Sequence, residues 1–431
     1  MQTAPKKVIN AWAMYDWANS AYNLVITSTI FPAYYVAITE KHFPNDEVIF
    51  FGRKFVNTSL YDYALAAAFL VVALISPILS SIADYKGNKK SFLRFFCLMG
   101  SASCFAMYWF DYSTLEFGII SVVIACIGFW ASLVYYNSYL PEIAAPEDRD
   151  RVSAKGFAMG YIGSVLLQIV SFLFVLKPEW FGIVDKSFPA RLSFLMVGVW
   201  WFGFAQITLF VLPKGKPAIQ RVGYNIFTNG FIELRKVFKE FMQIPILKRY
   251  LFSFFFYNMG VQTVMLAAAI FGKKELNMPE QSLIITILLI QIVAIAGAYA
   301  MSKLSSLIGN LKTLAIVVAI WIGICIAAYF VKTQMQFFVL ASVVGLVMGG
   351  IQSLSRSTYS KLMPVTHDTT SYFSFYDVTE KVAIVIGMFS FGFIEEITGT
   401  MRNSVLALMV FFIIGLIGLL FAMKKEKSMS I

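Results

Sequence analysis

Polar side chains follow one face of the first apolar segment, residues 11 to 35, which is long enough to cross a bilayer. They recur every three or four residues, which places them on one side of a helix: Trp12, Asp16, Asn19, Asn23 and Thr27. An ionised Asp inside a spanning helix costs about 2.5–3.5 kcal/mol on insertion scales, so this face should avoid lipid. Asp16 can bind a cationic group such as a substrate amine, or take up and release a proton. The structural alternative is a contact with the helix N-terminus or with a neighbouring cation.

A second polar face is predicted in the segment GGIQSLSRS, where Gln352 and Arg356 lie four residues apart. Arg356 can form a bidentate pair with a carboxylate, either as an anchor for a substrate or as a partner in a gate. The alternative is that its guanidinium snorkels to the membrane surface. Uncharged contacts to a polar ligand are expected from Tyr257, Asn258 and Gln262.

Three charges lie close together in the segment SYFSFYDVTEKVAIVIG. Asp377 and Lys381 are four residues apart, so they can pair within one helix. Glu380 is then left to meet Arg356 or a proton. A helix with this much charge should line a gate rather than face lipid, and the alternative is a self-neutralised structural cluster.

The composition is that of a membrane protein. The chain has 431 residues, of which 59% are hydrophobic and 14% are charged, whereas soluble domains carry about 25% charged residues. Long apolar stretches recur along its whole length, which predicts an all-α polytopic protein with twelve spans. The expected spans centre near Asn23, Val72, Met99, Ile127, Gln168, Phe202, Val261, Ile290, Ile320, Gly345, Ile384 and Ile413.

The net charge of +11 comes from basic residues in short loops between the spans. Most of the 35 Lys and Arg residues fall in cytoplasmic segments if both termini are cytoplasmic, which is the arrangement that the positive-inside rule favours. A bilayer, and not a nucleic acid, is therefore the expected partner of this charge. The four Cys and two His residues have no metal-like spacing and no nucleophile–base cluster stands out, so neither a cofactor nor an enzyme activity is expected.

The chain divides into two similar halves. Three short matches recur in the same order in both: YDWA with YNMG, GNKK with GNLK, and YLP with LMP. They predict a six-helix half over 1–212 and a second over 249–431, in which Asn258 corresponds to Asp16. Two parallel six-span repeats around a central cavity are the architecture of the major facilitator fold.

The segment 213–248 between the halves is predicted to contain an amphipathic helix on the cytoplasmic membrane surface. Its apolar stripe consists of Phe227, Phe231, Leu234, Phe238 and Phe241. Close helix contacts are expected at small residues in the fifth and tenth spans, namely Gly156, Gly160, Gly163, Gly345 and Gly349.

The loop SSIADYKGNKKSFL resembles the signature between the second and third spans of the major facilitator superfamily, with Asp84, Gly87 and Lys89 at the matching positions. Ser80 stands where that superfamily usually has Gly. The resemblance implies a gating loop that latches the two halves. Asp84 can accept hydrogen bonds from a facing helix N-terminus, while a simple basic turn is the structural alternative.

Four further stretches, YDWANSAYNLVITSTIFPAYY, YLPEIAAPEDRDRVSAKGFAMGYIG, YNMGVQT and GGIQSLSRSTYSKLMP, resemble the family related to the autophagy vacuolar amino-acid effluxers. Met259 stands where many relatives are expected to have Asp, so ion coupling or substrate is expected to differ from theirs. The resemblance implies transport of a small molecule, with amino acids as the suggested class.

The sequence is therefore interpreted as a secondary transporter of a small polar solute in the plasma membrane, working as a monomer by alternating access. Protonation of Asp16 or Glu380 is the hypothesis for its coupling. Two alternatives stay open: a non-transporting receptor or scaffold with a transporter fold, and a lipid scramblase.

Overall fold

The computed structural model describes residues 2–43, 47–215 and 226–429. The part 216–225 of the predicted linker and the side chain of Phe227 lie outside these residues.

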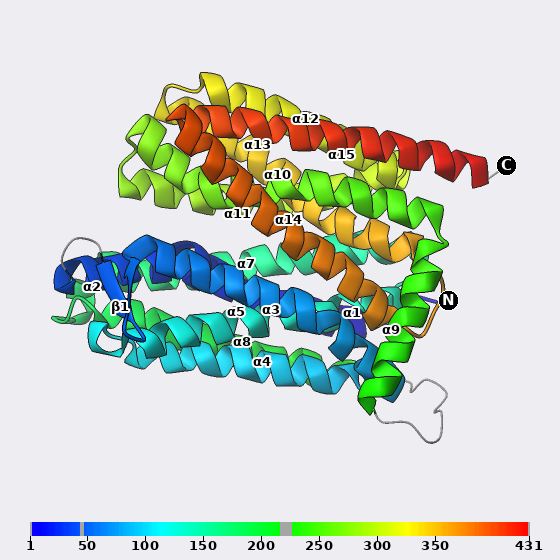
Figure 1. The fold of residues 1–431 in the computed structure, drawn as a ribbon, viewed down its shortest axis with the longest axis horizontal. Coiled ribbons are helices and arrows are strands. Elements are labelled where there is room, and N and C mark those ends of the chain that lie inside the picture. The colour runs from blue at the N-terminus through cyan, green and yellow to red at the C-terminus, as the bar shows by residue number, and fades with distance from the viewer. Residues whose placement is uncertain (1, 44–46, 216–225, 430–431) are drawn as a thin grey trace.

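Long α-helices make up most of the described chain, as the apolar segments predict (Figure 1). In the first part of the chain they are α1 (Lys6–Ala21), α2 (Phe31–His42), α3 (Asn57–Lys86), α4 (Lys89–Ala106), α5 (Leu115–Asn137), α6 (Leu140–Ile143), α7 (Arg149–Leu176) and α8 (Phe188–Val211). In the second part they are α9 (Ile226–Met242), α10 (Pro245–Leu276), α11 (Glu280–Ile308), α12 (Asn310–Phe330), α13 (Gln334–Leu362), α14 (Thr369–Thr398) and α15 (Met401–Met429). A π-helical segment, η1 (Tyr22–Ile30), joins α1 to α2, and short 3₁₀ turns cover Met107–Trp109, Tyr112–Thr114, Pro146–Asp148 and Pro178–Phe181.

One small β-hairpin interrupts the helical architecture, and it was not predicted. Strands β1 (Glu47–Phe50) and β2 (Arg53–Val56) pair antiparallel across a tight turn. Phe51 and Gly52 both have positive φ, which is the backbone that two-residue hairpin turns of the primed type require.

Eleven helical segments of the described chain are long and apolar enough to cross a membrane, and they correspond to all the predicted spans but one. The exception is α14, whose 30 residues include Asp377, Glu380, Lys381, Glu395 and Glu396. Helix α14 is long enough to cross a membrane, but it carries too many charged residues to be identified as a span from its composition alone.

The buried side chains form two hydrophobic cores. One is built almost entirely from α1 to α8, and the other mainly from α9 to α15. Figure 1 shows these helices as two groups, with both termini and α9 at the same end of the molecule. Helix α14 bridges the groups because it packs against α3 and α5 as well as against α10 and α15.

Glycines bring several helices into close contact, as their spacing predicts. A Cβ atom at Gly349 would stand 2.0 Å from the carbonyl oxygen of Ala294, and one at Gly345 would stand 2.6 Å from that of Ile290. A Cβ atom at Gly163 would likewise stand 2.5 Å from the carbonyl oxygen of Trp17. These glycines therefore set the approach of α13 to α11 and of α7 to α1.

Helix α9 forms where the sequence predicts it, but its apolar stripe is divided. Phe231 is 56% exposed, whereas Phe241 is buried and its ring lies 5.5 Å from that of Phe375. Lys236 extends to Glu233 at 2.7 Å and to Asp368 at 3.3 Å, and these two carboxylates raise its pKa. Part of the stripe thus packs on α14, and the rest is available to a membrane surface.

Candidate functional site

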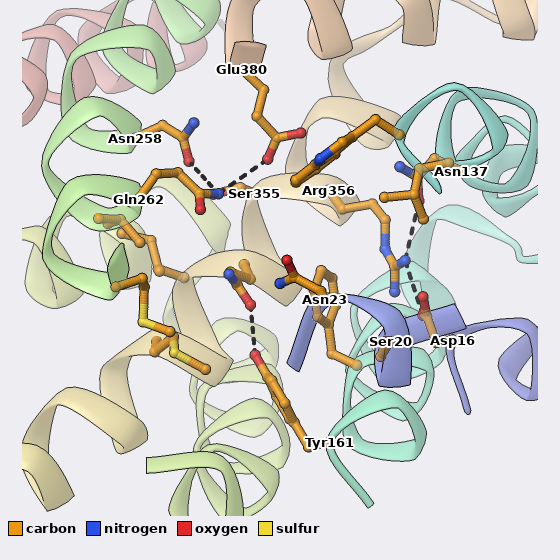
Figure 2. A pocket seen from close by; sticks show the side chains of 18 of the residues that line it. Asp16, Ser20, Asn23, Asn137, Tyr161, Asn258, Gln262, Ser355, Arg356 and Glu380 are labelled. Atoms are coloured by element: carbon orange, nitrogen blue, oxygen red, sulfur yellow. Dashed lines mark hydrogen bonds and ion pairs between the residues drawn. The ribbon is translucent and has the colours of Figure 1, made fainter. Parts of the chain in front are cut away.

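A polar cavity lies between the two groups of helices (Figure 2). Helices α1, α5 and α7 wall it on one side, and α10, α11, α13 and α14 on the other. Most of the residues that the sequence singles out line it: Asp16, Asn19, Asn23, Tyr257, Asn258, Gln262, Gln352, Arg356 and Glu380. Asp377 and Lys381 stand behind the wall and do not line it.

The two buried charges of the cavity form an ion pair. The Asp16 carboxylate lies 3.2 Å from the guanidinium of Arg356, and Figure 2 shows this contact between α1 and α13. The side chains of Asp16 and Arg356 are only 8% and 3% exposed, so Arg356 does not snorkel to the surface. Arg356 is thus a cation next to Asp16, as the structural alternative for Asp16 expected, and a role of Arg356 in a gate or in substrate binding stays a prediction.

Hydrogen bonds hold both members of the pair in place. The Tyr136 hydroxyl donates to Asp16 at 2.7 Å. The guanidinium donates to the side chain of Asn137 at 3.1 Å, and to the hydroxyl and carbonyl of Ser153 at 3.0 and 2.9 Å. Buried charges are retained at low cost only when such partners satisfy them. The ion pair is thus a well-satisfied buried contact between the two groups of helices.

Gly156 makes room for this pair on α7. A Cβ atom there would stand 2.5 Å from Oδ2 of Asp16 and 2.8 Å from Nη2 of Arg356. Any larger residue would have to displace one of the two charges.

The polar face of α1 continues along the cavity to Asn23 but does not reach Thr27. The reason is the π-helical segment η1, at whose end the backbone amide of Phe31 donates to the carbonyl of Ile26, five residues earlier. A π turn holds more residues than an α turn, which rotates the following side chains off the predicted face. Within the face, Asn19 is fully buried and neither of its amide atoms has a partner.

A second charged group lies on α14. Lys381 Nζ is 2.8 Å from Asp377 and 3.0 Å from Glu380, so the predicted pair within the helix is present. The same ammonium lies over the ring of Trp130 at 3.7 Å from its centroid. Glu380 also accepts a hydrogen bond from Gln262 at 3.3 Å.

Of the two partners expected for Glu380, Arg356 or a proton, the described contacts do not include Arg356, and the proton stays a prediction. Lys381 is adjacent to Glu380 in the chain and reaches both carboxylates, while Arg356 is already held by Asp16 and Ser153. Glu380 therefore pairs with its neighbour Lys381 on the same helix and not with Arg356 on α13.

The loop after α3, for which the resemblance implies a gating role, contacts the start of α14 through Asp84, which was predicted to bind a facing helix N-terminus. Asp84 accepts hydrogen bonds from the backbone amides of Thr370 and Ser371 at 3.2 and 2.7 Å. Gly87 ends α3 with φ of 64°, a left-handed conformation that suits glycine. Lys89 extends to Glu142 and, at 3.4 Å, to Thr369.

Sequence reasoning missed a further contact at the same end. Asp150 of α7 binds Lys361 of α13 at 2.7 Å and the side-chain amide of Asn310 at 2.7 Å. It lies in the stretch APEDRDR, whose mixed charges look like an ordinary loop. Tyr161 was also missed, although its hydroxyl donates to Gln352 at 2.6 Å inside the cavity. A Tyr in an apolar helix gives little signal, because a core Tyr looks the same.

Comparison with known proteins gives the same architecture. The family described as "Vacuole effluxer Atg22 like" matches residues 4–430. An MFS-type transporter of Bacillus subtilis (strain 168), YxiO, is 31% identical over 425 residues, or 97% of this chain and 95% of that protein. Autophagy-related protein 22 of Yarrowia lipolytica is 25% identical over 463 residues, or 86% and 76% of the two chains.

Solved structures share the fold at much lower identity. The major facilitator transporter FucP in its outward conformation superposes with a TM-score of 0.71 at 12% identity, covering 96% of this chain and 98% of FucP. The proton:xylose symporter XylE superposes with a TM-score of 0.73 at 11% identity, covering 97% and 95%. Together with the match over nearly the whole sequence, these findings show that the chain belongs to the vacuole effluxer Atg22-like family of the major facilitator superfamily.

Proposed function

We propose that the protein is a secondary transporter that moves a small polar solute, of the amino-acid class, across the plasma membrane by alternating access. The observation that carries the proposal is the ion pair of Asp16 with Arg356, which joins both groups of helices at the wall of a polar cavity. A contact of this kind can close one side of a binding site and can be broken to open it.

The contacts near the chain termini support a closed gate at that end. Asp84 with Ser371, Asp150 with Lys361, and Arg149 with the carbonyl of Ser360 each join one group of helices to the other. The positive-inside count favours a cytoplasmic location for this end. The halves 1–212 and 249–431 of a monomer then rock against each other around the cavity, with 213–248 as their cytoplasmic tether.

Protonation of a cavity carboxyl, Asp16 or Glu380, is the proposed coupling step. Neutral Asp16 would no longer attract Arg356, which would favour opening of the cytoplasmic side. The solute is then released as the proton equilibrates with that side.

The test is uptake by proteoliposomes under an imposed pH gradient, preceded by a thermal-shift screen of amino acids, small peptides, sugars and nucleosides. An amino acid should stabilise the wild type, and its uptake should respond to the gradient. Asp16→Asn should abolish the pH response, and unchanged uptake in this variant would overturn the coupling role of Asp16. Binding without flux would indicate a receptor, and binding of another solute class only would replace the amino acid.

A further inference from the structure

The charges of the cavity do not cancel on the α14 side. Asp16 and Arg356 compensate each other, one to one. On α14, by contrast, the carboxylates of Asp377 and Glu380 share the single ammonium of Lys381. When both carboxylates are ionised, this group carries one uncompensated negative charge in a buried place.

Within the α14 group, Glu380 is the member that lines the cavity. Its side chain is 17% exposed, compared with 5% for Asp377 and 0% for Lys381. Figure 2 shows its carboxylate directed toward Gln262 and the interior of the cavity. The excess negative charge is therefore presented where a ligand would bind.

Aromatic rings surround the same part of the cavity. Tyr376, Phe254, Tyr257 and Trp130 are among its lining residues, and the rings of Phe254 and Tyr376 stack with centroids 4.3 Å apart. The face of an aromatic ring attracts a cation, as the ammonium of Lys381 over Trp130 already demonstrates in this protein. Rings next to a carboxylate are a surface that suits an organic ammonium group.

Among the described residues of the cavity wall, the buried side-chain atoms that lack a hydrogen-bond partner are uncharged. They are both amide atoms of Asn19, the amide nitrogen of Asn258 and the amide oxygen of Gln291, and all lie in buried positions on the cavity wall. Groups of this kind accept a ligand that replaces their missing hydrogen bonds. They do not supply the positive charge that a carboxylate prefers, and the guanidinium of Arg356 is already occupied by Asp16.

We propose that Glu380 binds a primary ammonium group of the solute, and that the ammonium is required whereas a carboxylate on the solute is dispensable. This inference rests on the proposed transport function and defines its substrates by their ammonium group, so that amino acids and cationic organic amines without a carboxylate both qualify. It leaves Asp16 as the carboxyl that exchanges a proton.

The experiment uses three amino acids of different size, alanine, leucine and phenylalanine, each with its amide and its N-acetyl derivative. Binding to the purified full chain in nanodiscs is measured by titration. For at least one of the three, the amino acid and the amide should bind and the N-acetyl derivative should bind at least tenfold more weakly. Glu380→Gln should lower the affinity for both amines by about tenfold, because it replaces a charge-assisted hydrogen bond to the ammonium by a neutral one.

The matched control is Glu395→Gln on the same helix, because Glu395 pairs with Lys274 and does not line the cavity. It should leave both affinities unchanged. Glu380→Asp, which keeps the charge on a shorter side chain, should retain part of the preference for amines, so that a folding defect in the Gln variant can be recognised.

Three results would overturn the inference: equal binding of the N-acetyl derivatives, full affinity in Glu380→Gln, or no binding of any amine. Uptake separates this failure from failure of the transport function. Uptake of an anionic or neutral solute into proteoliposomes, without amine binding, would support the transport function and refute the amine site. Amine binding that depends on Glu380, without flux of any solute, would support the amine site and refute the transport function.

Discussion

The carboxylate of Asp16 and the guanidinium of Arg356 lie 3.2 Å apart although 340 residues separate them in the chain. The contact joins α1 to α13, and therefore one hydrophobic core to the other. In the proposed alternating-access cycle, rocking of the two groups of helices would lengthen it. Its strength is thus a direct control on the balance between the two states of a transporter.

Removal of one member of this pair should destabilise the protein more than removal of both. Arg356→Gln leaves the Asp16 charge buried without its cation, a change that typically lowers the free energy of unfolding by about 3–5 kcal/mol. The double variant Asp16→Asn, Arg356→Gln removes both charges and should lose less than the sum of the two single variants. Denaturation in mixed detergent micelles measures this coupling, and additive losses would show that the two residues do not interact.

Gly156→Ala should disrupt the pair without altering either charge. The new methyl group would stand 2.5 Å from Asp16 and 2.8 Å from Arg356, so one of them must move. We expect solute uptake to fall at least tenfold. Gly203→Ala is the control, because a Cβ atom at Gly203 meets nothing within 4 Å. Equal uptake by the two variants would contradict the tight contact at Gly156.

Asp84→Asn should shift the protein toward a state that is open at the end of the termini. The substitution removes the negative charge that accepts hydrogen bonds from Thr370 and Ser371. A loss of about 1.4 kcal/mol from these contacts would raise the open population tenfold relative to the closed one. This loss is smaller than the contribution of one hydrogen bond to a charged group.

The shift can be followed with a cysteine at Ser355, which lines the cavity, because the four native cysteines are all buried. An impermeant maleimide applied to inverted vesicles should label Ser355→Cys faster when Asp84→Asn is also present. Glu147→Gln, an exposed acid at the same end, is the control. Equal labelling rates in all three backgrounds would rule out a latch at Asp84.

Lys381→Met should be strongly destabilising, because it leaves the carboxylates of Asp377 and Glu380 buried without a cation. A loss of about 3–5 kcal/mol is expected. Lys274→Met is the matched control, since Lys274 pairs with Glu395 at 3.0 Å and is 61% exposed, and exposed pairs contribute about 0–1 kcal/mol. Thermal unfolding midpoints of the two variants provide the comparison, and a similar small change in both would refute the structural need for Lys381.

The sequence predicted the spans well because lipid imposes length and apolarity on each helix separately. It also predicted most of the cavity wall, since polar side chains in spanning helices must face inward. The pairing of charges was harder. The pair of Asp377 with Lys381 is local and was predicted, whereas nothing in the local pattern connects Asp16 with Arg356. The π-helical segment that turns Thr27 away from the cavity has no simple signature either.

Helix α14 cannot settle in the bilayer as an isolated span during biosynthesis. A charged residue near the middle of a spanning helix opposes its partitioning by about 2.5–3.5 kcal/mol, and Asp377, Glu380 and Lys381 all act in this direction. In the finished protein Lys381 rests on the ring of Trp130, and Asp84 holds the first turn of α14. Both partners are synthesised long before α14 emerges from the ribosome. The first half of the chain therefore serves as the template that receives this helix, and damage to α3 or α5 should appear as a defect in the assembly of the second half.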